Sequence, residues 1–134
     1  MVDCDVPSCY VGVAVVEDEK DLARMYQLAL KNRNVQICFI AYDGLEAVKK
    51  FTECPVKPPI ILLDYRLPTM NGIDVMKEIH KLSPDTRMII LSADGFVKKE
   101  AIQAGAFMFL DKPCSFKVVI DAIDRARNGH NTPY

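Results

Sequence analysis

Short apolar runs alternate with amphipathic helical segments along this chain, and that alternation constrains its fold more than any other feature. The apolar runs are rich in branched side chains and too short for helices, so we expect strands at residues 11–16, 35–41, 60–63, 88–91 and 107–110. Helical periodicity is clearest over residues 22–30 and 116–123 and weaker over residues 45–51, 73–82 and 97–104. Because the strands are apolar on both faces, the pattern predicts a parallel sheet covered by helices on both sides.

The expected fold class is therefore α/β: a doubly wound, five-stranded parallel sheet with strand order 2-1-3-4-5, the flavodoxin-like (βα)5 arrangement. Turn and cap residues such as Asn71-Gly72 and Ser83-Pro84 fall between the expected elements. A length of 134 residues suits one domain. We expect its core at about residues 11–127, an N-terminal extension over 1–10, and a tail or the start of a linker over 128–134.

Composition argues against nucleic acid and membrane as direct partners. The 17 basic and 18 acidic side chains nearly balance, which indicates no polyelectrolyte partner. No apolar run approaches the roughly 18 residues of a membrane span. Residues 1–10 carry Asp3 and Asp5 where a signal peptide would carry Lys or Arg. We therefore expect a cytoplasmic protein.

The five cysteines lack the spacing of a zinc or redox site, so we expect reduced thiols. Cys4 and Cys9 could chelate a metal or pair with each other, but two ligands near the chain terminus are an incomplete metal site. Cys38 lies within an apolar run and is expected in the core.

Chemically active side chains follow four of the five expected strands. Ligands of parallel α/β sheets collect beyond the carboxyl ends of the strands. In this chain those positions are Glu17 and Asp18 after the first strand, Asp64 after the third, Ser92 after the fourth and Lys112 after the fifth. With order 2-1-3-4-5 the first and third strands are neighbours, so the three carboxylates are expected in one crevice, flanked by Ser92 and Lys112.

Three clustered carboxylates favour a hard divalent cation, because like charges raise one another's pKa. An all-oxygen set points to Mg²⁺, with Mn²⁺ as the alternative. A hydroxyl and an ammonium group can hold the remaining oxygens of a phosphoryl group. Each residue also has an ordinary interpretation: Glu17 to Glu19 as first-turn charges of a helix, Ser92 as a cap and Lys112 as a surface charge. Their joint placement at strand ends is what these interpretations leave unexplained.

Three motifs carry a family resemblance. Residues 60–72 (IILLDYRLPTMNG) contain an apolar run, an aspartate, and a proline and a glycine four and eight residues later. Residues 88–93 (MIILSA) and the segment from Ala104-Gly105-Ala106 to Lys112-Pro113 lie at matching distances. Over about residues 11–127 the chain resembles the receiver domain of two-component response regulators, in particular the chemotaxis regulators. These are phospho-aspartate switches of bacterial, archaeal and some eukaryotic signalling.

The resemblance implies a role for each residue. Asp64 is the expected phosphoacceptor. Glu17, Asp18, Asp64 and the backbone carbonyl of Arg66 are the expected metal ligands. Ser92 is expected to hydrogen-bond the phosphoryl group, Lys112 to pair with it, and Lys112-Pro113 to be a cis peptide. Phe109, three residues before the lysine, corresponds to the switch aromatic of the family, where many members have Tyr.

The resemblance also implies the partners. A sensor histidine kinase or phosphotransfer protein is expected to phosphorylate Asp64. The surface formed by the fourth helix, fifth strand and fifth helix is then expected to control a downstream protein or an output domain beyond this chain, and a homodimer through that surface is left open. The protein is not expected to be an enzyme beyond catalysing its own phosphorylation and dephosphorylation. Arg66 and Asp94, of opposite charge, are expected either to gate the approach of water to the phosphoryl group or to point independently into solvent.

Other classes fit less well. A flavodoxin would need hydroxyls and backbone amides in its first loop, where Glu17, Asp18 and Glu19 would repel a phosphate. An aspartyl-phosphate hydrolase of the dehalogenase type would need a second acid where Arg66 stands. The remaining alternative is a receiver-like docking module that no longer takes phosphate, and the presence of Asp64, Ser92 and Lys112 argues against it.

Overall fold

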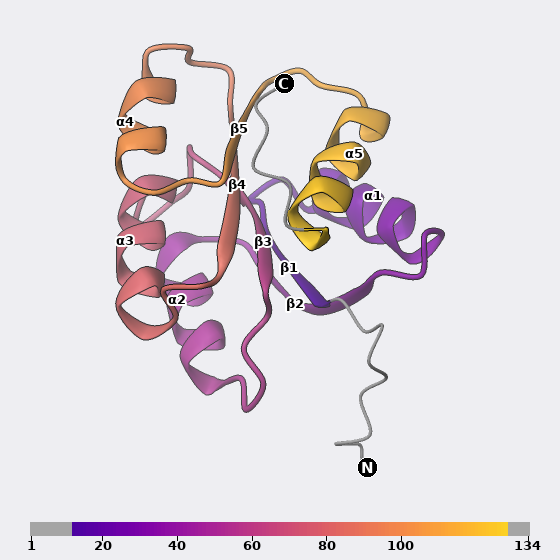
Figure 1. Ribbon diagram of the computed structural model, residues 1–134, viewed down its shortest axis with the longest axis horizontal. Helices are drawn as coiled ribbons and strands as arrows, with labels where there is room; N and C mark the ends of the chain where they lie inside the picture. Colours follow the sequence, from indigo (N-terminus) through magenta and orange to yellow (C-terminus); the bar gives the residue numbers. More distant parts are fainter. Residues whose placement is uncertain (1–11, 129–134) are drawn as a thin grey trace.

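The computed structural model describes residues 12–128, and within them it contains five strands and five helices (Figure 1). The strands are β1 (Gly12–Val16), β2 (Gln36–Ala41), β3 (Ile60–Asp64), β4 (Arg87–Ser92) and β5 (Met108–Asp111). The helices are α1 (Lys20–Lys31), α2 (Gly44–Glu53), α3 (Gly72–Leu82), α4 (Val97–Gln103) and α5 (Phe116–Arg127). The expectations for residues 1–10, including Cys4 and Cys9, and for Val11 lie outside the described residues, as does the tail beyond Asn128.

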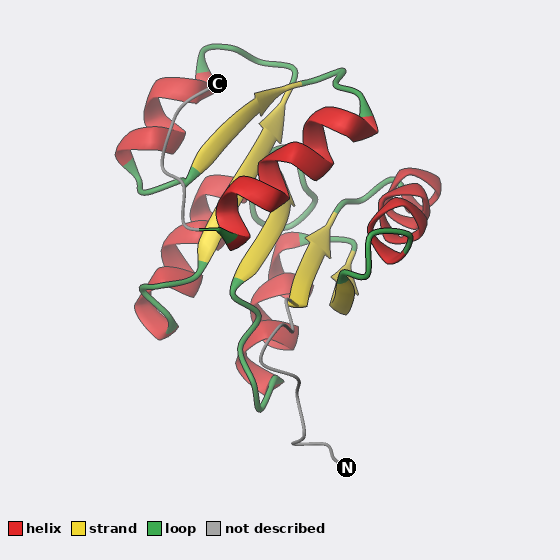
Figure 2. Ribbon diagram, turned by 45° about the vertical axis from the view of Figure 1, so that its right-hand side comes forward, coloured by secondary structure: helices red, strands yellow, loops and turns green. Residues whose placement is uncertain are grey.

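All strands pair in parallel in the order β2-β1-β3-β4-β5, which confirms the predicted topology. Helices α1 and α5 cover one face of the sheet and α2, α3 and α4 cover the other, so the sheet lies between two helical layers (Figures 1 and 2). In residues 12–128 no helix is long and apolar enough to cross a membrane.

Two apolar cores, one on each face, hold these layers together. Alternate residues of β1 divide between them: Val13 and Val15 pack with α1 and α5, while Ala14 and Val16 pack with α2, α3 and α4. Because both faces are buried, β1 and β3 are apolar throughout their length, apart from Asp64 at the end of β3.

One expectation about the core was wrong. Cys38 is only half-buried, because β2 is an edge strand and most of its residues keep part of their surface exposed. Met25, which fits the apolar periodicity of α1, is 49% exposed, whereas Tyr26 and Leu30 carry the buried face of that helix. Periodicity locates an apolar stripe but does not fix its edges within one residue.

The loop after β3 is held by short-range contacts that explain its glycine. The Asn71 side chain caps α3 by accepting from the Asp74 N–H. The N–H of Gly72 donates to the Tyr65 carbonyl at 2.8 Å. A side chain at Gly72 would bring its Cβ to 2.6 Å from the backbone oxygen of Asp64. Only glycine lets α3 begin this close to the end of β3.

Candidate functional site

The strand register brings the sequence-predicted residues to one edge of the sheet. Val16 pairs with Leu63, so Glu17 emerges beside Asp64. Ser92 is the last residue of β4 and pairs with Asp111, and the Lys112 N–H donates to the Ser92 carbonyl at 2.9 Å. Residues up to 95 positions apart in sequence therefore meet at this edge.

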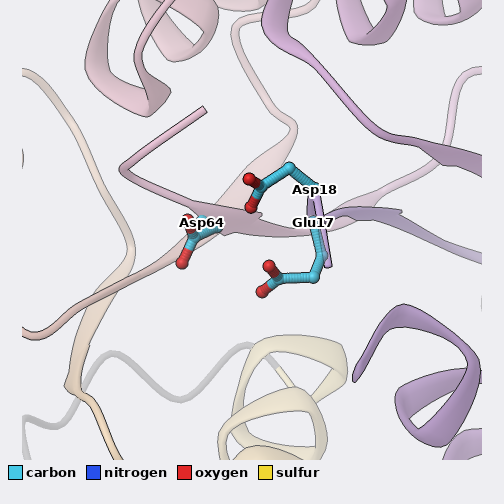
Figure 3. Close-up of side chains that lie close together, drawn as sticks. All are labelled: Glu17, Asp18 and Asp64. Carbon is cyan, nitrogen blue, oxygen red and sulfur yellow. The ribbon is translucent and has the colours of Figure 1, made fainter. Parts of the chain in front are cut away.

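Glu17, Asp18 and Asp64 form a compact acidic cluster. One carboxylate oxygen from each lies within 4.8 Å of the others, and the three side chains point toward a common space (Figure 3). Glu17 and Asp64 are buried at 2% and 5% exposure, whereas Asp18 is exposed. The predicted convergence of the three carboxylates is present.

Lys112 lies against two of these carboxylates. Its Nζ is 2.6 Å from Asp64 Oδ1 and 3.1 Å from Glu17 Oε1. The ammonium group therefore bridges β1 and β3 from the end of β5 and provides the cation that a buried Asp64 requires. The Lys112-Pro113 peptide bond is cis, as the resemblance implies.

Burial and mutual repulsion perturb the titration of the cluster. Burial, followed by the charge of Asp64, raises the pKa of Glu17 to about 7. Burial also raises the pKa of Asp64, against the opposing hydrogen bond from Lys112. Burial lowers the pKa of Lys112, but its bonds to Asp64 and Glu17 outweigh this effect, so that pKa lies above its usual range. The site therefore retains a proton or a cation near neutral pH.

The free energy of unfolding of the metal-free protein is expected to fall as pH rises from about 5 to 8. Between its unfolded pKa of 4.5 and its folded pKa of about 7, Glu17 binds more protons in the folded state, so rising pH favours unfolding. Asp64 shifts in the same direction, Asp18 adds negative charge nearby, and Lys112 stays protonated. We expect a loss of about 2 kcal/mol, after allowance for solvent screening.

Urea unfolding in chelator at successive pH values measures this loss. The matched variant Glu17→Gln is expected to give a flatter profile, since Gln does not titrate. A profile as steep in Glu17→Gln as in the parent would mean that another group is responsible.

Ser92 and Phe109 lie on the adjoining strands. Ser92 is 2% exposed, and its Oγ accepts from the Asp94 backbone N–H at 3.0 Å. Phe109 pairs with Ile90 in β5 and is 8% exposed in the core on the α4 side of the sheet. A change at Ser92 is therefore connected to the backbone that begins α4.

Arg66 and Asp94 approach each other loosely at the mouth of the site. Arg66 Nη2 is 3.9 Å from Asp94 Oδ2, and the Arg66 side chain is 75% exposed. Asp94 also accepts from the Phe96 N–H at 3.0 Å, which fixes its carboxylate. The two side chains are close enough to interact. Their expected role in obstructing the approach of water to the phosphoryl group remains a prediction.

Two backbone donors at the site have no signature in the sequence. The Arg66 N–H hydrogen-bonds the Asp64 carboxylate, and the Glu19 N–H donates to Glu17 Oε2 at 3.2 Å. Side-chain patterns do not reveal where a loop N–H points, although the loop directly after a strand-end carboxylate brings backbone N–H groups close to that carboxylate. These donors leave other carboxylate oxygens available.

The donor set fits a small hard cation. Glu17, Asp18 and Asp64 offer oxygen ligands close together, and oxygen is what Mg²⁺ prefers. Buried, mutually repelling carboxylates gain from a divalent cation, because it removes the repulsion that raises the pKa of Glu17. Asp18, exposed at the rim, leaves one side open to water or a phosphoryl oxygen.

Comparison with known proteins identifies the family. Residues 13–124 match the model of the response regulator receiver domain. The chain is 36% identical to the chemotaxis protein CheY of Thermotoga maritima over 115 residues, which cover 84% of this chain and 94% of that protein. It is 34% identical to the regulatory protein LuxO of Vibrio cholerae over 102 residues, 75% of this chain but only 22% of LuxO.

Solved structures of receiver domains have the same fold as this chain. The signal receiver domain of the response regulator NarL from Mycobacterium tuberculosis superposes with a TM-score of 0.81 at 28% identity, covering 90% of this chain and 98% of that one. CheY in a complex with CheX, BeF3 and Mg²⁺ from Borrelia burgdorferi superposes with a TM-score of 0.79 at 26% identity, covering 84% and 86%.

The chain belongs to the response regulator receiver domains of two-component signalling. Within that class it is of the CheY-like type. Receiver domains are signalling modules rather than enzymes in the usual sense, and they interact with kinases and with output or partner domains.

Proposed function

We propose that this protein is a switch controlled by phosphorylation of Asp64. The observation that carries the proposal is the contact of Lys112 with both Asp64 and Glu17 beside three converging carboxylates. A nucleophile, a cation site and an ammonium group within one crevice are the parts that phosphoryl transfer requires. The proposed extent is a single receiver domain with its core at residues 11–127.

The chemistry follows from the contacts. An Asp64 carboxylate oxygen attacks phosphorus, and the leaving group of the donor takes the electron pair of the broken bond. Glu17, Asp18, Asp64 and the Arg66 carbonyl would hold Mg²⁺ or Mn²⁺, and this cation supplies charge neutralisation. Lys112 and the Ser92 hydroxyl hold the phosphoryl oxygens. The donor is a sensor histidine kinase, a phosphotransfer protein or a small phosphodonor.

The proposed response begins at Ser92. Its Oγ now accepts from the Asp94 N–H, and turning toward the phosphoryl group would release that bond. Asp94 caps the Phe96 N–H directly before α4, so its release changes the start of that helix. Phe109, on the same side of the sheet, would turn into the space that Ser92 vacates. A surface of α4, β5 and α5 then controls a downstream protein or output domain in the cytoplasm.

Intact-mass measurement after incubation with acetyl phosphate tests the function. We expect one added phosphoryl group in the presence of Mg²⁺ and none in excess chelator. Unchanged mass under every condition, with the protein folded, would leave docking without phosphorylation as the function.

The phosphorylated form is expected to lose its phosphoryl group faster in Arg66→Ala and in Asp94→Ala. If the pair obstructs water, as its 3.9 Å separation supports, each change should speed dephosphorylation about twofold to fivefold, since an exposed pair contributes up to about 1 kcal/mol. The double variant should lose its phosphoryl group faster than either single variant. Its fold increase in rate should be smaller than the product of the two single increases, because both changes remove the same pair. The measurement is decay of the phosphorylated mass in Mg²⁺ without a phosphatase. Unchanged rates in both single variants would rule out the gate.

A further inference from the structure

The loop that joins β3 to α3, residues 65–71, borders the candidate cation site. A pocket of about 420 Å³ lies between this loop and Asp18, and Arg66 is among the loop residues that line it. The Arg66 N–H also hydrogen-bonds the Asp64 carboxylate. Arg66 therefore lies beside two of the three clustered carboxylates, and its carbonyl is the fourth expected metal ligand. The position of that carbonyl depends on how the loop is held.

The base of this loop is fixed by main-chain hydrogen bonds. The Tyr65 N–H donates to the Leu91 carbonyl of β4 at 2.9 Å, and the Gly72 N–H donates to the Tyr65 carbonyl at 2.8 Å. These bonds tie both ends of the loop to the edge of the sheet. The tip of the loop, residues 68–70, lies beyond them and needs contacts of its own.

The first turn of α2 supplies those contacts. The Gly44 N–H donates to the Pro68 carbonyl at 3.1 Å. The Thr69 hydroxyl donates to Asp43 Oδ1 and accepts from the Leu45 N–H, both at 3.0 Å. The glycine at position 44 permits this approach, since a Cβ there would lie 2.2 Å from a backbone oxygen of the tip. The tip of the loop is therefore docked on the start of α2.

Thr69 has a backbone conformation that its side chain disfavours. Its φ is +69°, in the left-handed region that β-branched residues rarely adopt. The two hydrogen bonds of its hydroxyl stabilise this conformation. Without them the tip is expected to relax to another backbone conformation. Because Thr69 is only three residues after Arg66, such a change would displace the Arg66 carbonyl.

We propose that Thr69 is a positioning residue for the cation: its hydroxyl ties the loop tip to α2 and thereby holds the Arg66 carbonyl in place to bind Mg²⁺. Although the four expected ligands lie outside α2, the first turn of that helix then supports the site. The inference rests on the cation site of the proposed function, which Mg²⁺ binding tests separately from phosphorylation.

Calorimetric titration of the metal-free protein with Mg²⁺ tests the proposal. Thr69→Val keeps the branched shape of the side chain but removes the hydroxyl, so its Kd for Mg²⁺ should be about fivefold to tenfold higher than that of the parent. Thr69→Ser retains the hydroxyl and should bind Mg²⁺ within about twofold of the parent. Thr52→Val is the matched control. It removes a threonine hydroxyl that donates to the Val48 carbonyl within α2, away from the loop, and should leave the Kd unchanged.

A second readout separates positioning from a purely structural role. The initial rate of phosphorylation by acetyl phosphate is measured as a function of Mg²⁺ concentration. In Thr69→Val the half-saturating Mg²⁺ concentration should rise as the Kd does. The rate at saturating Mg²⁺ should stay within about twofold of the parent, since Asp64, Ser92 and Lys112 are unchanged.

Each other outcome has a definite meaning. A parent-like Kd for Mg²⁺ in Thr69→Val, even with a lower free energy of unfolding in urea, would make Thr69 purely structural and overturn the inference. An equal loss of affinity in Thr69→Ser would also overturn it, because the hydroxyl would not be the cause. Weaker Mg²⁺ binding by Thr69→Val, with no phosphorylation of the parent by any donor, would overturn the proposed function and leave this inference standing.

Discussion

Asp64→Asn is expected to abolish phosphorylation by any donor. The substitution keeps the size of the side chain but removes the oxygen nucleophile. The other carboxylate of the cluster that contacts Lys112 is that of Glu17, which directly follows β1. Incubation with acetyl phosphate and Mg²⁺ should add one phosphoryl group to the parent and none to the variant, at any time that the parent signal is detectable.

Loss of folding is not the expected cause. Burial raises the pKa of Asp64, so a neutral amide at that position relieves electrostatic strain in the metal-free protein. Urea unfolding should show Asp64→Asn at least as stable as the parent in chelator at neutral pH. Asp111→Asn, which changes an exposed carboxylate at the end of β5, is the matched control and should be phosphorylated normally. Retention of the phosphoryl group by Asp64→Asn would show that another residue is the acceptor.

Lys112→Ala is expected to separate metal binding from the conformational response. Its ammonium touches Asp64 and Glu17, so removing it leaves two buried carboxylates without their cation. In chelator at neutral pH the variant should lose about 3 kcal/mol of unfolding free energy. Mg²⁺ should bind at least as tightly as in the parent, because the competing ammonium is gone, and should restore most of this stability.

The response to phosphorylation should nevertheless disappear in Lys112→Ala. Without the lysine the phosphoryl group loses an ion pair that links it to the end of β5. Hydrogen exchange of α4 and β5 before and after phosphorylation, or with beryllofluoride as its mimic, measures the response. Lys99→Ala, an exposed lysine on α4, is the control and should respond as the parent does. A parent-like change in Lys112→Ala would mean that the lysine is not part of the switch.

The topology of this protein could be predicted from its sequence because its strands and its helices are both encoded by local sequence patterns. Each strand is a short run of branched apolar residues, such as residues 60–63, and each helix has a periodic apolar face. The strand limits agree with prediction within about two residues. Placing Glu17, Asp18, Asp64 and Lys112 at one edge then followed from parallel topology alone.

Other features depended on three-dimensional packing. Cys38 has an apolar sequence context like that of the buried strands, yet β2 lies at the sheet edge and leaves Cys38 partly exposed. Met25 fits the periodicity of α1 but falls outside the stripe that α5 and the sheet cover.

Sequence alone determined which side chains gather at the site, because strand order and strand ends are encoded by local apolar patterns and turn residues. Only the tertiary structure decided how they share charge: Lys112 lies 2.6 Å from Asp64 and 3.1 Å from Glu17, and burial raises the pKa of Glu17 to about 7. The physical reason is that electrostatic interactions depend on distances of a few ångström and on the solvent that packing excludes. Both are set by contacts between residues far apart in the chain.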